Sequence, residues 1–258
     1  MKKKHRLADT GKDKSVFVPQ DDKIKFNLSI RERNDLTERQ KELNNLILDK
    51  ETKIVFVNGP AGTSKTFCAV YCALKMLNEK RVSNITYVRT VVESASRSLG
   101  ALPGNSSEKM DPFLMPLMDK LDEFLPKLQS KKLVEDEAVK GVYIGHLRGA
   151  SLNSQVIICD ESQNFTKKEI LTAVSRLGRF SKIIILADPA QSDINSHSGF
   201  MPMFDLFNDE ESRSKGIHCF SFTKDDIVRS GVLRYILERI ENYNINHQPK
   251  HEPMFPVK

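Results

Sequence analysis

The feature that most constrains the fold is a glycine-rich turn between an apolar strand and an apolar helix. Residues 54–57 read I-V-F-V, and G-P-A-G-T-S-K-T follows at residues 59–66. Residues 67–74 are then mostly apolar, which is typical of a buried helix. A strand, a glycine-rich turn and a helix in this order are the context that a phosphate-binding loop requires. The sequence therefore predicts an α/β fold.

The residue types in this turn suit a nucleoside triphosphate. Backbone N–H groups of a loop and of the first helical turn point at a bound phosphate, and the helix dipole adds partial positive charge. Lys65 is expected to bridge the β and γ phosphates, and Thr66 to place its hydroxyl on Mg²⁺. The predicted nucleotide-binding loop comprises Gly59, Pro60, Ala61, Gly62, Thr63, Ser64, Lys65 and Thr66.

One position departs from the usual G-x-x-x-x-G-K-[ST] pattern. Ser64 stands where the pattern has its second glycine. A side chain there costs conformational freedom but leaves the lysine, the threonine and the N–H donors in place. The sequence thus indicates a serine-tolerant variant of the loop. The alternative is a Gly-Pro turn that precedes a lysine by chance, and the flanking strand and helix argue against it.

Two adjacent carboxylates form the second chemical landmark. Residues 156–159 are an apolar run that predicts a strand, and Asp160 and Glu161 follow it directly. In a nucleotide site one such acid holds the Mg²⁺ shell and the next polarises water, so Asp160 is assigned the first role and Glu161 the second. The alternative is an N-cap for a helix that begins near residue 167.

Three further side chains are candidates for the same site. Gln191 follows the predicted strand 182–187 and is expected to contact the γ phosphate. Gln40 can present its amide to an adenine edge, although a Thr-x-x-Gln capping box explains it equally well. Arg229 lies at a strand-to-helix connection, where a cation can reach a neighbouring site; alone, it would more often be a surface residue.

Composition limits the other classes of protein. Residues 1–33 hold ten basic and five acidic residues and so carry +5 of the net charge of +6, which leaves the rest of the chain almost neutral. No apolar run approaches the ~18 residues of a membrane span, and no apolar stretch follows the basic N-terminus, so neither membrane insertion nor secretion is expected. The cysteines, which lack C-x-x-C spacing, indicate small buried residues in a reducing compartment. These are Cys68, Cys72, Cys159 and Cys219.

Periodicity and turn residues divide the chain into a basic, largely flexible arm (1–34), an α/β domain (35–241) and a disordered tail (242–258). Strands are predicted at 54–57, 85–88, 142–147, 156–159, 182–187 and 217–222, and helices at 35–49, 67–79, 110–128, 167–177, 198–207 and 232–240. A polar connection is expected at 131–140. Residues 89–104 are expected to form a long loop with functional or mobile character, and its ionisable members are Arg89, Glu93 and Arg97.

With these elements placed, the sequence resembles the PhoH-like family of P-loop ATPases, relatives of the superfamily-one helicase core. The matching stretches lie between about residues 37 and 240. In order they are G-P-A-G-T-S-K-T, L-G-A-L-P-G, E-K-M-D-P-F-L-M-P-L, H-L-R-G-A-S-L-N, I-I-C-D-E-S-Q-N, A-D-P-A-Q-S-D and F-T-K-D-D-I-V-R. Their order and spacing make the resemblance specific, and D-P-F-L-M-P-L is the most telling because no general ATPase requirement produces it.

The resemblance implies a P-loop NTPase with a RecA-like single core, a central mostly parallel sheet and flanking helices. It implies that Gln40 recognises adenine, Lys65 and Thr66 the phosphates and magnesium, Asp160 and Glu161 hydrolysis, Gln191 the γ phosphate, and that Arg229 acts as a finger in trans in a ring. The family is expected to contain cytoplasmic ATPases linked to phosphate starvation and RNA metabolism. Ser64 and Ala187 depart from the helicase-like pattern and bear on the rate more than on binding.

The leading hypothesis is an ATP hydrolase that uses Mg²⁺ and couples to RNA or single-stranded DNA. A small-molecule kinase of the P-loop class is one rival, although it would usually carry a substrate lid and lack an Asp-Glu-x-Gln sequence. A nucleotide-binding assembly module that hydrolyses poorly because of Ser64 is the other. Turnover of ATP with and without nucleic acid separates these three alternatives.

Overall fold

A single parallel sheet organises the protein. The computed structural model describes residues 27–90, 106–147 and 151–228, with side chains from residue 114 in the second range, and five helical residues between 231 and 239. Within these residues, six strands pair in parallel in the order β3-β2-β4-β5-β1-β6. The predicted α/β fold, with a central mostly parallel sheet flanked by helices, is therefore confirmed.

The elements follow one another as strands that alternate with helices. The strands are β1 (Ile54–Asn58), β2 (Asn84–Arg89), β3 (Val139–Tyr143), β4 (Gln155–Cys159), β5 (Lys182–Ala187) and β6 (Ile217–Ser221). The helices are α1 (Glu38–Leu48), α2 (Lys65–Asn78), α3 (Ser106–Phe124), α4 (Lys127–Glu135), α5 (Lys167–Val174), α6 (Phe200–Leu206) and α7 (Glu210–Ser214). No helix among the described residues is long and apolar enough to cross a membrane.

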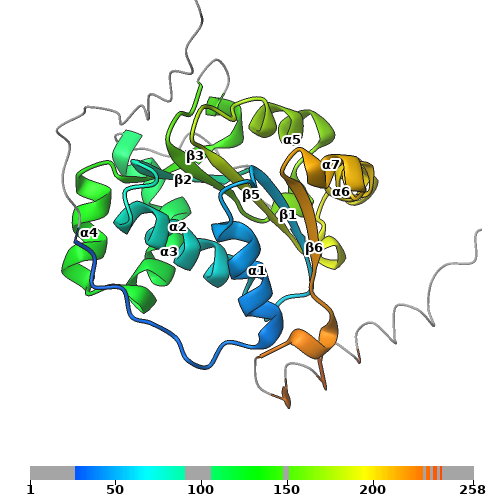
Figure 1. Cartoon of the computed structure of the whole chain (residues 1–258), viewed down its shortest axis with the longest axis horizontal. Helices are drawn as coiled ribbons and strands as arrows, with labels where there is room; N and C mark the ends of the chain where they lie inside the picture. Colours follow the sequence, from blue (N-terminus) through cyan, green and yellow to red (C-terminus); the bar gives the residue numbers. More distant parts are fainter. Residues whose placement is uncertain are drawn as a thin grey trace, which may run out of the picture.

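Both faces of the sheet are covered, which explains the continuous apolar runs in the strands. Val55 and Val57 of β1 belong to an apolar cluster with residues of α1, α2 and α3. Ile54 and Phe56, which alternate with them, belong to a second cluster with residues of α5 and α6. Figure 1 shows α1 to α4 on one side of the sheet and α5 to α7 on the other. A strand buried on both faces loses the apolar-polar alternation of a half-exposed strand.

The strand order brings together the C-terminal ends of three strands, β1, β4 and β5. β5 lies between β1 and β4, with Asn58 beside Ala187 and Cys159 beside Ile185. Because the three strands are parallel, the residues that follow them emerge at the same edge of the sheet. In open α/β sheets this edge is where ligands bind. The fold therefore places the glycine-rich turn, the Asp-Glu pair and the residues after β5 side by side.

The helices between residues 110 and 140 were predicted wrongly in two places. The predicted helix 110–128 ends at Phe124, because Pro126 has no N–H to continue it, and Leu128 is 80% exposed on the separate helix α4. The predicted polar connection 131–140 contains most of α4. Leu133 is buried on this helix, but the mixed charges around it in the sequence do not indicate a helix with a buried face.

The third strand is also earlier than predicted. β3 spans Val139–Tyr143 rather than 142–147, and residues 144–147 form a 3₁₀ turn. Gly141 explains why the strand can lie there, because a Cβ at this position would meet Leu114 Cδ2 of α3 at 2.7 Å. The glycine allows α3 to approach the strand closely, whereas in the sequence it reads as a strand breaker.

The last part of the predicted arm packs against the domain. Leu28 is buried, and its main-chain N–H donates to Asn78 Oδ1 at 2.8 Å. The main-chain N–H of Arg31 donates to the carbonyl of Phe124 at 2.8 Å. Residues 28–31 therefore contact the domain, within the arm that was predicted to be largely flexible up to residue 34. Arg229, most of the predicted helix 232–240, residues 91–105 and the tail lie outside the described residues.

Lys182 is a buried cation at the start of β5. The residue is 5% exposed, and its Nζ donates to the carbonyl of Asp49 at 2.6 Å and to that of Ile47. These carbonyls lie at the C-terminal end of α1, where a helix leaves acceptors without intrahelical partners. Burial, with a smaller contribution from Arg81, lowers the pKa of Lys182 to about 8.

This lowered pKa predicts a pH-dependent stability. The unfolded chain keeps the Lys182 proton up to a pKa near 10.5, so between pH 8 and 10.5 it binds more protons than the folded chain. The free energy of unfolding, relative to a Lys182→Met variant, should therefore rise over this range by on the order of 1 kcal/mol. Urea unfolding of both proteins at several pH values measures it. A difference that stays constant with pH would contradict the burial of this amine.

Candidate nucleotide-binding site

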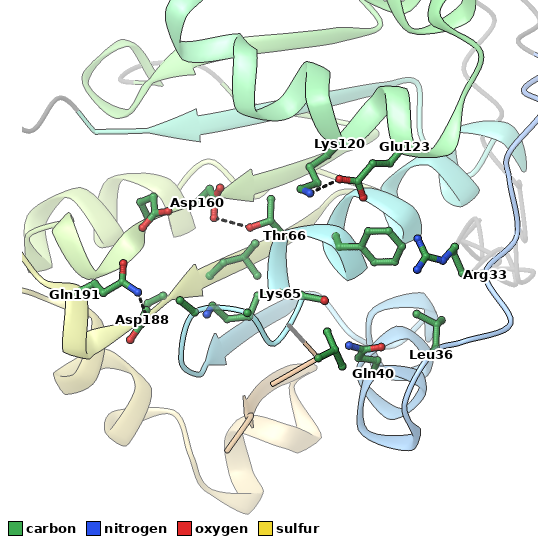
Figure 2. A pocket seen from close by; sticks show the side chains of 18 of the residues that line it. Arg33, Leu36, Gln40, Lys65, Thr66, Lys120, Glu123, Asp160, Asp188 and Gln191 are labelled. Atoms are coloured by element: carbon green, nitrogen blue, oxygen red, sulfur yellow. Dashed lines mark hydrogen bonds and ion pairs between the residues drawn. The ribbon is translucent and has the colours of Figure 1, made fainter. Parts of the chain in front are cut away.

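A cavity of ≈ 380 Å³ lies where the glycine-rich turn faces the ends of β4 and β5. The turn and the first residues of α2 contribute Ala61, Gly62, Ser64, Lys65 and Thr66 to its lining. Asp160, Glu161 and Gln163 reach it from the end of β4, Asp188 and Gln191 from the end of β5, and Gln40 from α1. Figure 2 shows these side chains converging on one space from different elements.

Two residues of the turn have a positive φ angle. Gly62 has φ 88°, and Ser64, which directly precedes α2, has φ 68° and ψ 28°. A positive φ favours glycine, so Ser64 adopts a conformation that a side chain disfavours. Gly59 is required for a different reason: a Cβ there would meet Cβ of Phe222 at 2.7 Å. The first glycine thus permits close packing, while Gly62 permits the turn.

Ser64→Gly is expected to stabilise the protein, because the strained φ of Ser64 becomes unstrained in glycine. The expected gain is about 1 kcal/mol in the free energy of unfolding, reduced by the larger entropy of glycine in the unfolded chain. Urea unfolding of the variant and the wild type measures it. Ser83→Gly, outside the loop and without a positive φ, serves as the control and should not be stabilised. Destabilisation by Ser64→Gly would show that the hydroxyl contributes more than the strain.

Lys65 points along the turn. Its Nζ donates to the carbonyls of Gly59 at 2.6 Å and of Pro60 at 3.0 Å. Burial lowers the pKa of Lys65, while the carboxylates of Asp188, Asp160 and Glu161 act in the opposite direction. A largely desolvated ammonium held only by neutral carbonyls gains much from an anion. The loop therefore presents a cation that a phosphate can bind.

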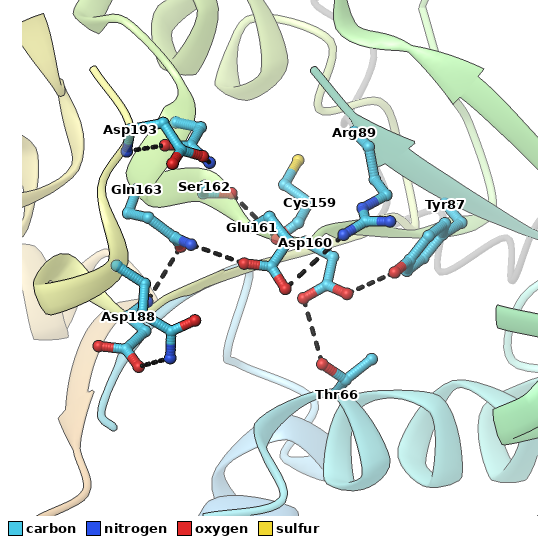
Figure 3. Close-up of polar contacts among 12 residues, drawn as sticks. Thr66, Tyr87, Arg89, Cys159, Asp160, Glu161, Ser162, Gln163, Asp188 and Asp193 are labelled. Atoms are coloured by element: carbon cyan, nitrogen blue, oxygen red, sulfur yellow. Dashed lines mark hydrogen bonds and ion pairs between the residues drawn. The ribbon is translucent and has the colours of Figure 1, made fainter. Parts of the chain in front are cut away.

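Thr66 and Asp160 form the part of the site that suits a magnesium ion. The hydroxyl of Thr66 donates to Asp160 Oδ1 at 3.1 Å. Neighbouring oxygens in an octahedral Mg²⁺ shell, each ~2.1 Å from the ion, lie ~3 Å apart, so the spacing of this pair fits the ion. Tyr87 of β2 donates its hydroxyl to Asp160 Oδ2, which fixes the carboxylate (Figure 3). Burial is the main cause of the raised pKa of Tyr87, so the phenol remains a donor.

Glu161 is held by two neighbours. Its backbone has φ 54° and ψ 37°, a left-handed conformation that turns the chain sharply after β4. Gln163 Nε2 donates to Glu161 Oε2 at 2.6 Å, and Arg89 Nη2 lies 3.6 Å from Glu161 Oε1. Gln163 is itself fixed, because its Oε1 accepts from the main-chain N–H of Asp188 at 3.0 Å. One hydrogen-bonded network therefore joins the ends of β4 and β5.

The residues after β5 complete the phosphate end of the cavity. Asp188 is buried, and its Oδ2 accepts from Gln191 Nε2 at 2.6 Å. Its Oδ1 accepts from the main-chain N–H of Ala190 at 3.2 Å, which caps a short 3₁₀ turn. Gln191 therefore faces the cavity with its amide already positioned. The carboxylate of Asp188 also contributes to the negative potential around Lys65.

The opposite end of the cavity is lined by Gln40 and Phe67, among other residues. Gln40 is 2% exposed; its Oε1 accepts from the Thr37 main-chain N–H at 3.1 Å, so the predicted capping box is present. This bond leaves the Nε2 donors, and a second lone pair on Oε1, for a ligand. Phe67 adds an apolar wall, and the Arg33 guanidinium lies over its ring, 5.3 Å from the centroid. Capping and base contact are therefore compatible roles for Gln40.

The structure brings most of the predicted site residues to one cavity. Gln40, Ala61, Gly62, Ser64, Lys65, Thr66, Asp160, Glu161 and Gln191 line it. Gly59, Pro60 and Thr63 are not among the lining residues; Thr63 is fully buried and its hydroxyl donates to the Pro60 carbonyl at 2.9 Å. Arg229 lies outside the described residues, but the main-chain N–H of Val228, the preceding residue, donates to the Gly62 carbonyl at 3.2 Å.

Tyr87, Arg89 and Asp188 are among the site residues that were not predicted. Tyr87 reads as an ordinary strand residue, and its contact with Asp160 depends on the pairing of β2 with β4. Arg89 was noted only as an ionisable loop member, and no sequence signal links it to Glu161. Asp188 could have been predicted from the sequence, because it follows an apolar strand directly, just as Asp160 does.

The fold and the cavity together define a P-loop NTPase core, with a phosphate-binding loop after β1 and an Asp-Glu pair after β4. A family model described as PhoH-like protein matches residues 33–241, which is most of the sequence. The chain belongs to this family, and the resemblance found in the sequence is thereby confirmed.

Characterised sequences and solved structures show how far the similarity extends. PhoH-like proteins of Mycobacterium tuberculosis (strain H37Rv) and Bacillus subtilis (strain 168) are 36% and 34% identical over 248 and 197 residues. These alignments cover 92% and 76% of this chain but 65% and 60% of the relatives, so the chain spans less than two-thirds of their length. Among solved structures, the Pif1 helicase from Candida albicans aligns with a TM-score of 0.41 and 13% identity, covering 80% of this chain and 43% of that one.

Proposed function

We propose that the protein binds ATP with Mg²⁺ and hydrolyses it. The observation that carries the proposal is the convergence of Lys65, Thr66, Asp160 and Glu161 on one cavity, although about a hundred residues separate the first pair from the second. The geometry supports separate roles for these groups: the cation for terminal phosphates, the hydroxyl and first carboxylate for the metal, and the second carboxylate for water. Mg²⁺, when bound, would neutralise charge on the β and γ phosphates.

Different residues would have different roles in hydrolysis. Thr66 and Asp160 would hold the ion, with Tyr87 fixing the carboxylate by its hydrogen bond. Glu161 would accept a proton from the attacking water, which requires that one of its oxygens be free. Gln191 would contact the γ phosphate, and its bond to Asp188 makes the contact sensitive to the residues after β5. Hydrolysis could thereby be transmitted to the sheet edge.

Adenine is the base that the far end of the cavity favours. Gln40 Nε2 can donate to N7 of a purine, and the second lone pair of its Oε1 can accept from the exocyclic amine of adenine. Guanine presents a carbonyl at that position, which would face Gln40 Oε1 unfavourably. The capping bond from Thr37 fixes the amide in the orientation that distinguishes the two bases.

We further propose coupling to RNA or single-stranded DNA, in the cytoplasm and in a homo-oligomer. The helicase-like order of motifs and the +5 charge of residues 1–33 support the nucleic-acid partner, because basic segments bind phosphate backbones without sequence preference. Arg229 would reach the site of a neighbouring subunit in a ring. The support for this role is the match of Arg229 to the late arginine of the family, in the stretch F-T-K-D-D-I-V-R.

Turnover of ATP with and without single-stranded RNA and DNA tests the proposal. Hydrolysis that requires Mg²⁺ and rises with either nucleic acid is the expected result. A P-loop kinase would instead transfer phosphate to a metabolite and release none to water, and that outcome would overturn the proposal. A poorly hydrolysing assembly module would bind ATP with little turnover, and Ser64→Gly would raise its rate at least about tenfold, ~1.4 kcal/mol of barrier.

A further inference from the structure

A second cavity adjoins the nucleotide site and shares its wall. It is lined in part by Arg89 and Thr90 at the end of β2 and by Asn164 and Asp193 beyond β4 and β5. Glu161, Gln163 and Gln191 line both cavities, so the Asp-Glu turn forms the partition between them. In Figure 3, Arg89 reaches towards Glu161 from the β2 side, while Thr66 lies on the other side of Asp160.

Both carboxylate oxygens of Glu161 are occupied in this arrangement. Oε2 accepts from Gln163 at 2.6 Å, and Oε1 lies 3.6 Å from Arg89 Nη2. A carboxylate oxygen that faces a guanidinium or already accepts a hydrogen bond has fewer lone pairs open to an attacking water than a free oxygen. The ion pair with Arg89 is therefore opposed to the role proposed for Glu161.

The Arg89 contact is weak enough to be exchanged. A separation of 3.6 Å exceeds that of a hydrogen bond, and the two side chains are 26% and 46% exposed. Among the described residues, the Arg89 guanidinium makes this ion pair and no hydrogen bond, so its planar set of donors is available to a ligand. An anion that offers two oxygens to the guanidinium would compete successfully with Glu161.

We propose that Arg89 is a positioning residue that couples the second cavity to hydrolysis. A phosphodiester group of a single-stranded nucleic acid binds the Arg89 guanidinium, breaks the ion pair and frees Glu161 Oε1 to accept a proton from water. This inference rests on the proposed function and deepens it, because it names the group through which nucleic acid raises the rate.

The lining of the cavity favours a sugar-phosphate backbone over a base. Apart from Ala190, the described lining residues are polar or charged, and none is aromatic, so a base has no surface on which to stack. Two carboxylates also lie there: Asp193, which accepts from the Asn164 amide at 2.9 Å and keeps its charge, and Glu161, which is paired with Arg89. Arg89 is thus the one group among these that an incoming phosphate can pair with.

Arg89→Gln tests the coupling directly. With the ion pair removed, ATP turnover without nucleic acid should rise about three- to fivefold, towards the stimulated rate of the wild type, and oligonucleotide should add little more. Arg81→Gln is a matched control, because Arg81 pairs with Glu79 at the same 3.6 Å and its side chain is also 26% exposed. Its basal and stimulated rates should equal those of the wild type.

Oligonucleotide binding provides a readout that does not depend on turnover. Fluorescence anisotropy with oligouridylate and oligothymidylate of equal length should show about tenfold weaker binding to Arg89→Gln, and a salt slope smaller by about one. Arg89→Lys, which keeps the charge, should retain most of the affinity. Loss of one phosphate contact accounts for both changes.

The outcomes separate the two proposals. A wild type that hydrolyses ATP, with an Arg89→Gln variant whose basal rate is unchanged or lower, would overturn the coupling and leave the proposed function standing. A wild type without ATP turnover would overturn the proposed function, and the release of Glu161 would fall with it. Oligonucleotide affinity that is equal in Arg89→Gln and the wild type would overturn the phosphate site in either case.

Discussion

Lys65→Ala is expected to weaken ATP binding about a hundredfold or more and to abolish turnover. The desolvated ammonium is the cation of the loop, and truncating one partner of a buried, hydrogen-bonded charge pair costs about 3 kcal/mol or more. Calorimetric titration with ATP and Mg²⁺ measures the loss, and phosphate release measures the rate. Urea unfolding of the variant checks that it is folded, because the substitution removes the hydrogen bonds to the Gly59 and Pro60 carbonyls and a cation that lies near three carboxylates.

A lysine elsewhere on the same helix provides the control. Lys75 of α2 lies over the Tyr71 ring, 5.7 Å from its centroid, and does not line the cavity. Lys75→Ala should bind ATP as the wild type does. Binding that is equally strong in Lys65→Ala and the wild type would remove Lys65 from the site. Equal losses in both variants would show that general charge, rather than this cation, holds the nucleotide.

Glu161→Gln is expected to keep ATP binding while lowering turnover by about a hundredfold to ten-thousandfold. Glutamine keeps the size of the side chain and can still accept from Gln163, but it cannot take a proton from water. Binding should persist because Lys65 and Thr66 are untouched. Single-turnover phosphate release and nucleotide titration of the same preparation separate the two effects.

Glu79→Gln is the matched control for this carboxylate. Glu79 pairs with Arg81 at 3.6 Å and is 45% exposed, against 46% for Glu161, but it lies outside the cavity. Its substitution should leave turnover unchanged. If Glu161→Gln hydrolysed ATP at a rate within about threefold of the wild type, another group would have to accept the proton. A parallel loss of binding would instead assign Glu161 to the nucleotide rather than to water.

The phosphate loop, the Asp-Glu pair and the main strands were predictable because they rest on local patterns. The I-V-F-V run and the glycines that follow it predict β1 and the turn, and the apolar run before Asp160 predicts β4. Strand order follows from none of these patterns. It is set by packing over long sequence separations, and it is what places Asp188 between the loop and the acids.

The misassigned elements show where local patterns fail. The apolar spacing in the sequence of α3 continues to Leu128, yet the proline at 126 ends the helix and that leucine is exposed on α4. Gly141 reads as a breaker but serves as a contact point for α3. In both cases one backbone constraint outweighed the side-chain pattern.

Contacts between distant side chains were the least predictable part of the site. Tyr87 reaches Asp160 only because β2 and β4 pair in register, and Arg89 reaches Glu161 for the same reason. The left-handed turn at Glu161 accompanies the contacts of its carboxylate with Arg89 and Gln163. No residue spacing in the sequence predicts these contacts, because they depend on β2, on β4 and on the turn that follows β4.

A crystal structure of the protein with Mg²⁺ and a non-hydrolysable ATP analogue tests the central claim most directly. The account predicts the triphosphate in the turn at residues 59–66, with Lys65 at the terminal phosphates, the ion on Thr66 beside Asp160, and adenine at Gln40. An analogue bound away from the turn, or one whose phosphates lie far from Lys65 and the Asp160–Glu161 pair, would contradict it.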